Sequence, residues 1–158
     1  MTCFPLLSFL IAVVLVATVS SSDERNIVRI INSGSTNTNG YAIELHREGI
    51  VKWSVTHRGH QISSTTPSTP SSTTTQMSIR LPSALVISVF QALQQASPLN
   101  QYPPIFCIKS VSFGTTLHVI YNGQQSPDLD CPLEDSRLIS LNKAVREVIS
   151  FLHINTLG

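Results

Sequence analysis

Three apolar-rich stretches follow one another in the first half of the chain, and in the second and third of them hydrophobic and polar residues alternate with a period of two. These stretches are residues 26–33 ("NIVRIINS"), 41–48 ("YAIELHRE") and 51–56 ("VKWSVT"). Such alternation is typical of a strand with one buried face. Asn-Gly and Glu-Gly pairs between the stretches are common turn sequences, so we predict an antiparallel meander of three strands.

Two longer stretches place their apolar residues at helical spacing instead. Residues 81–100 ("LPSALVISVFQALQQASPLN") have Pro82 near the start and Pro98 near the end, where proline marks a helix boundary. Residues 134–154 form a second amphipathic stretch, with Asp135 at the end where the helix dipole favours a negative charge. We therefore predict two helices, each with an apolar face for the core.

Two further strands are predicted between these helices. Residues 105–113 ("IFCIKSVSF") and 117–121 ("LHVIY") are rich in β-branched and aromatic residues and flank Gly114. If they pair around this turn, Val111 and Phe113 share the buried face of the second strand.

The resulting element order, β-β-β-α-β-β-α, predicts an α+β fold. The expected architecture is a small antiparallel sheet with two helices packed on one face. At the level of topology this order resembles small exported protease-inhibitor domains that pair a short sheet with two helices. The resemblance implies a binding function, but it concerns the fold and not any motif.

Residues 62–75 ("ISSTTPSTPSSTTT") interrupt the predicted sheet with a segment of low complexity. The segment is almost devoid of apolar residues, so it gains too little from burial to offset the entropy of ordering. The piece before it is too short to form a domain of its own. We therefore predict an exposed loop within one α+β domain that spans residues 22–158.

The amino terminus carries an apolar run followed by small polar residues and then charges. This pattern is typical of a secretory signal peptide, which we assign to residues 1–21. The expected location is secreted or extracytoplasmic, with no stable membrane insertion once the signal is cleaved. The alternative is a protein anchored in the membrane by an uncleaved N-terminal segment.

The net charge bears on the class of partner, and the cysteine content bears on whether the protein carries a disulfide. The net charge is only +1, so the chain lacks the basic surface that nucleic-acid binding requires. After removal of the signal, two cysteines remain, Cys107 and Cys131. An even pair in an exported chain predicts a disulfide.

The sequence also offers two candidates for a catalytic or metal site. Ser112 and His118 have the side chains of an acyl-transfer site and lie on the two strands predicted to pair around Gly114. The surrounding sequence is nevertheless not a nucleophile elbow, because nothing helical follows. His46, His57 and His60 form a second candidate, a histidine metal site, although their spacing matches no established pattern.

The residues beside the predicted disulfide favour a binding site over a reaction centre. Lys109, Tyr121, Asp128 and Asp130 are the candidate binding residues of this region. No motif for a cofactor or a resident metal is present in the sequence. We therefore expect a small secreted, non-enzymatic interaction module for an unknown protein or small ligand, with inhibition as one form of that binding. The alternative is a small secreted hydrolase that uses Ser112 and His118, or the histidine metal site.

Overall fold

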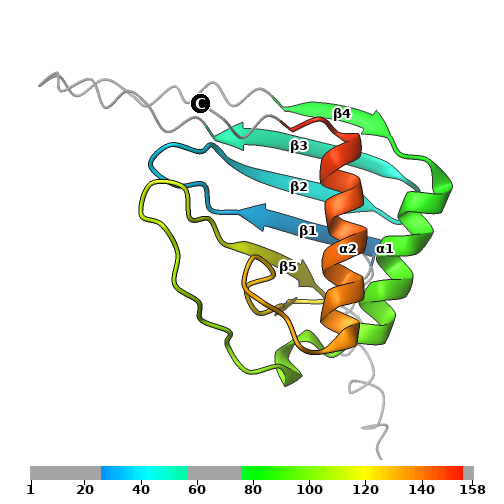
Figure 1. The fold of residues 1–158 in the computed structure, drawn as a ribbon. Helices are drawn as coiled ribbons and strands as arrows, with labels where there is room; N and C mark the ends of the chain where they lie inside the picture. The colour runs from blue at the N-terminus through cyan, green and yellow to red at the C-terminus, as the bar shows by residue number, and fades with distance from the viewer. Residues whose placement is uncertain (1–25, 57–75, 155–158) are drawn as a thin grey trace, which may run out of the picture.

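The computed structural model describes residues 26–56 and 76–154, which share one hydrophobic core (Figure 1). The predicted signal peptide (residues 1–21) and the predicted Ser/Thr/Pro-rich loop (residues 62–75) lie outside the described residues, so both stay predictions.

Nine elements follow one another along the described chain. They are β1 (Ile27–Asn32), β2 (Gly40–His46), β3 (Ile50–Thr56), β4 (Met77–Arg80), α1 (Ser83–Ala96), the short 3-10 helix η2 (Leu99–Gln101), β5 (Leu117–Tyr121), β6 (Gln124–Gln125) and α2 (Ser136–Phe151).

The strands form one antiparallel sheet, and both long helices cover the same face of it (Figure 1). The strand order is β4-β3-β2-β1-β5-β6, and every neighbouring pair is antiparallel. The predicted α+β class and the predicted meander β1-β2-β3 are therefore confirmed.

The core lies between the sheet and the helices, where the alternation of each strand meets the apolar face of each helix. Val28 and Ile30 on β1 are fully buried, and so is Ile43 on β2. Leu141 and Val145 face them from α2 and are also fully buried. Burial of this apolar surface is the main favourable contribution to folding.

A tight two-residue hairpin turn, Asn122-Gly123, joins β5 to β6. Asn122 and Gly123 both have positive φ angles, 52° and 70°. Two-residue hairpin turns of this kind need positive φ at both central positions, which asparagine and glycine accept more easily than other residues.

Two strands, β4 and β6, were not predicted. The residues of β4 form only a short run next to the low-complexity segment, and all of them are exposed. They become a strand because they pair with β3, from Ile50 opposite Arg80 to Trp53 opposite Met77. This pairing is a tertiary contact, which the local pattern does not encode.

The prediction of a strand at residues 105–113 is wrong. This segment has no strand assignment, and Val111 and Phe113, which we expected on the buried face, are 88% and 60% exposed. The segment is not a strand because the edge of β5 that does not face β1 is already occupied. β6 and the residues after it take the place in which the segment would have to pair. The outer edge of β5 is paired with β6 at Ile120 and Tyr121.

The remainder of that edge is filled by side chains and main chain of the loop after β6. The Val119 N–H donates to Ser126 Oγ at 2.9 Å, and Val119 O accepts from the Ser126 N–H at 2.8 Å. The Leu117 N–H donates to Asp128 Oδ1 at 3.0 Å, and Leu117 O accepts from the Leu129 N–H at 2.8 Å. Residues 105–113 are therefore excluded from the sheet and run outside it.

Candidate functional site

The excluded segment, residues 105–113, is the most unusual surface feature of the described chain, and we refer to it as the exposed segment. Its first half keeps the alternation of a strand without a neighbouring strand. Phe106 and Ile108 are 91% and 104% exposed, whereas the residues that alternate with them are half-buried and directed toward the protein: Ile105, Cys107 and Lys109. Alternate side chains thus anchor the segment, and the others project into solvent.

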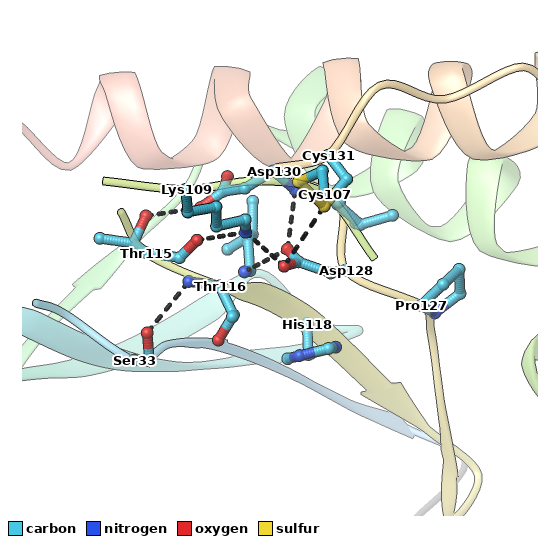
Figure 2. Close-up of polar contacts among 12 residues, drawn as sticks. Ser33, Cys107, Lys109, Thr115, Thr116, His118, Pro127, Asp128, Asp130 and Cys131 are labelled. Carbon is cyan, nitrogen blue, oxygen red and sulfur yellow. Dashed lines mark hydrogen bonds and ion pairs between the residues drawn. A yellow bond between two sulfur atoms is a disulfide. The ribbon is translucent and has the colours of Figure 1, made fainter. Parts of the chain in front are cut away.

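The disulfide supplies the first anchor. Cys107 is bonded to Cys131, with a Cα–Cα distance of 5.6 Å, and this confirms the predicted pair. Cys131 is buried just before α2, so the bond joins the middle of the exposed segment to the entrance of that helix (Figure 2). The bond also closes a loop of sequence separation 24, which restricts the unfolded chain.

Lys109 supplies the second anchor by turning its charge inward. Its Nζ donates to Asp128 Oδ2 and to the main-chain oxygen of Thr115 (Figure 2). The side chain of Asp128 is only 9% exposed and that of Lys109 20%, so the ion pair is largely withdrawn from water. A pair at this depth orders its surroundings more than a surface pair, which is screened and contributes little.

Asp128 is the centre of a hydrogen-bond network. Besides the lysine, its Oδ1 accepts from the main-chain N–H groups of Leu117 and Asp130, both at 3.0 Å. Burial by itself raises the pKa of Asp128, but the hydrogen bonds from Lys109, Leu117 and Asp130 together with the charge of Lys109 lower it below its ordinary value. The Cys131 sulfur lies 3.7 Å from Asp128 Oδ2; being in a disulfide, it has no proton to donate.

Asp130 continues the network toward α2. Its Oδ2 accepts from Thr115 Oγ1 at 2.6 Å, and its Oδ1 is paired with the guanidinium of Arg146. Asn142, one turn earlier on α2, donates from Nδ2 to Leu129 O at 3.0 Å. The loop that holds the exposed segment is therefore itself attached to a helix of the core.

The far end of the exposed segment is fixed by the β1–β2 loop. Ser112 O accepts from the Asn37 N–H at 2.9 Å and from Ser35 Oγ at 2.7 Å. Thr36 Oγ1 donates to Val111 O at 3.3 Å. Anchors at both ends and in the middle give the segment a defined conformation despite its exposure.

Shallow depressions flank the exposed segment on two sides. One, of about 680 Å³, lies between the segment and α2 and is lined by Ile108, Phe113 and Arg146 among others. The other, of about 340 Å³, is lined by Phe106, Tyr102 and His118 among others. Apolar side chains of the segment thus border both hollows.

The predicted binding residues do not all lie together. Lys109, Asp128 and Asp130 form the network described above, with their charged atoms bonded to one another or to Arg146. Tyr121 lies at another place, where its hydroxyl is 3.5 Å from a guanidinium nitrogen of Arg47. A ligand-binding role of these four residues stays a prediction, while the geometry gives the first three a bracing role.

The catalytic alternative finds no assembled site. His118 Nδ1 lies 3.1 Å from Ser126 O, and within the described residues no hydrogen bond joins His118 to Ser112. Of the histidine candidates, His46 lies on β2, whereas His57 and His60 lie outside the described residues. Within the described ranges, no group of three or more His, Cys, Asp or Glu side chains is placed to hold a metal ion.

Comparison with protein-family models, with curated proteins and with solved structures finds no match to this chain. Sequence reasoning missed the exposed apolar residues of this segment, because an alternating pattern predicts a half-buried strand whether or not a neighbouring strand accepts it.

Removal of the disulfide tests its contribution to stability. The double variant Cys107→Ser/Cys131→Ser should lower the free energy of unfolding by about 3.5 kcal/mol, because the unfolded chain regains the entropy of the open loop. Urea unfolding followed by circular dichroism measures this difference. Fully reduced wild-type protein is the control and should show the same loss, whereas two reactive thiols in native oxidised protein would contradict the bond.

The pH dependence of stability tests the Asp128 network. The folded-state pKa of Asp128 lies below its ordinary value of 3.8, so the unfolded state binds more protons between these two pKa values. Its stabilisation is therefore complete above pH 3.8 and is lost as pH falls through the lower, folded pKa. Asp128→Asn should lower the free energy of unfolding at pH 7 by roughly 1–3 kcal/mol and show a smaller further loss in acid than the wild type.

Asp135→Asn is the matched control for this experiment. The pKa of Asp135 is lowered to about 2, chiefly by its hydrogen bonds from Arg137, and among the described residues no hydrogen bond or ion pair joins this helix cap to Asp128, Lys109 or Asp130. Its variant should keep the acid-dependent loss that belongs to Asp128. Equal acid profiles for the wild type and Asp128→Asn would show that the network does not stabilise the fold.

Proposed function

We propose that this protein is a secreted, non-enzymatic interaction module that binds a partner protein through the exposed segment. The observation that carries the proposal is the gathering of large apolar side chains on a segment held in place by a disulfide, an ion pair and hydrogen bonds. These side chains are Phe106, Ile108, Val111 and Phe113, which are between 60% and 104% exposed. Single exposed apolar residues are ordinary, but a contiguous group of them marks an interaction site.

The anchors that fix the conformation of the exposed segment support a role in binding. A free loop pays an entropic cost when a partner orders it, and this cost is reduced when the fold already fixes the conformation. Cys107 and Lys109 fix it from below, between the residues that project into solvent. The same network leaves the charge of Lys109 neutralised, so the outward surface of Phe106 and Ile108 is apolar.

A protein partner fits this surface better than a small ligand. Small-molecule sites usually enclose most of the ligand in a cleft, whereas apolar side chains that project outward need a partner that surrounds them. Two phenylalanine side chains alone can bury roughly 300–500 Å². That is a large part of the ~800 Å² that each partner contributes to a standard protein interface.

The secreted location is part of the proposal and is supported by the disulfide and the N-terminal sequence. Disulfides persist in oxidising compartments and are rare in reducing ones. Within the described residues, no helix has the length and hydropathy needed to cross a bilayer.

Replacement of the outward side chains tests the proposed binding. Phe106→Ser/Ile108→Ser should leave stability within about 0.5 kcal/mol of the wild type, because both side chains are already in solvent. Immobilised wild-type protein should retain at least one specific protein from the extracellular fraction of its source, and the double variant should retain at least tenfold less of it. Quantitative mass spectrometry measures the ratio.

Ile139→Ser is the matched control, because Ile139 is an exposed isoleucine on α2 (48%) away from the exposed segment. Its variant should retain the captured protein as the wild type does. If no protein distinguishes the wild type from the double variant, the exposed segment is not the binding surface.

A further inference from the structure

The main chain of the exposed segment is as unusual as its side chains. Among the described residues, no hydrogen bond reaches the N–H or C=O of residues 105–109. Main-chain groups are strong donors and acceptors that are nearly always paired when they are buried. Any partner that covers Phe106 and Ile108 must therefore also offer hydrogen bonds to the main-chain N–H and C=O groups between them.

The exposure of the side chains in the first half of the segment follows the pattern of a strand. Exposure alternates from Ile105 to Lys109, as it does in a strand with one face against the protein. Tyr102 is extended, with φ −84° and ψ 135°, as expected for a residue before proline, and Pro104 restricts Pro103 in the same way, so the chain approaches the segment in an extended conformation. The segment is thus shaped for pairing with another strand.

This chain does not supply that strand within its described part. Both edges of β5, the nearest strand in sequence, are occupied, one by β1 and the other by β6 and the loop after it. The exposed segment is instead held by its inward side chains, Cys107 and Lys109. The main chain of residues 105–109 is left for a partner.

Proteins usually protect such an edge, and this one is unprotected. Natural edges are kept short or carry outward charges that discourage pairing with other chains. β4 follows that rule, since it has four residues and ends at Arg80, whose guanidinium donates to Glu48 O at 2.7 Å. In contrast, the only charge in the first half of the exposed segment, Lys109, turns inward.

We propose that the partner protein contributes an extended segment that pairs with the main chain of residues 105–109. Phe106 and Ile108 then fill apolar sites on the partner beside the paired strands. This inference rests on the proposed function and specifies how the binding occurs. A lipid surface is disfavoured, because hydrocarbon would cover the unpaired N–H and C=O groups without offering them hydrogen bonds.

Selected peptides serve as the probe for this pairing. A library of displayed random dodecapeptides is selected on the oxidised protein and counter-selected on Phe106→Ser/Ile108→Ser. The strongest peptide is then synthesised with a single N-methyl group at each position in turn. Affinity should fall at least tenfold at alternate peptide positions, because in a strand only every second N–H faces a given neighbour.

Residue-resolved amide exchange on the protein side gives an independent readout. In the complex with this peptide, protection should increase at alternate residues within 105–109, and Ile139→Ser should behave as the wild type. Binding that requires Phe106 and Ile108 but shows neither pattern would overturn strand pairing while leaving the proposed function intact. Failure to obtain any peptide that prefers the wild type over the double variant would contradict strand pairing, whereas the proposed function is decided by the capture experiment with Phe106→Ser/Ile108→Ser.

Two further measurements test whether a second copy of this chain or a lipid membrane, and not a partner protein, covers the exposed segment. Sedimentation of the protein alone at millimolar concentration should show a monomer; a dimer that Phe106→Ser/Ile108→Ser abolishes would make a second copy the occupant. Phosphatidylcholine vesicles should not retain the protein. Retention that depends on Phe106 and Ile108 would assign a membrane and overturn the proposal.

Discussion

The buried carboxylate of Asp128 is the contact on which the site and this edge of the sheet depend. One oxygen accepts the N–H of Leu117, so it occupies a position at the edge of β5 that a neighbouring strand would fill. The other oxygen holds the ammonium group of Lys109. The same side chain therefore helps to exclude the exposed segment from the sheet and anchors it outside.

The sequence predicted those parts of the fold that local pattern determines. The alternation at residues 41–48 and 51–56 became β2 and β3, and the helical spacing of residues 134–154 became α2 with Asp135 as its N-cap. The strand at 105–113 failed for a physical reason. Alternation shows that a segment has two kinds of face, but it does not show which segment pairs with the edge of β5. That edge is taken by β6, which follows β5 after a two-residue turn, and by Asp128 in the loop beyond it.

The candidate site was predictable only in part for the same reason. The Cys107–Cys131 pair followed from cysteine number and the expected compartment. Lys109 and Asp128 were selected as binding residues from their position beside it, but that position does not reveal that their charges meet each other. The exposure of Phe106 and Ile108 had no local signal, since apolar residues in an alternating run ordinarily face a core.

The central claim is that the exposed segment is rigid although its side chains are in solvent. Backbone ¹⁵N order parameters of Phe106, Cys107 and Ile108 in the oxidised, unbound protein test it most directly. If the disulfide, the ion pair and the hydrogen bonds hold the segment, these values should be near 0.85, as in the sheet, and should decrease clearly in Asp128→Asn. Values below about 0.6 in the wild type would show that residues 106–108 form a flexible loop and that the anchors do not hold the segment.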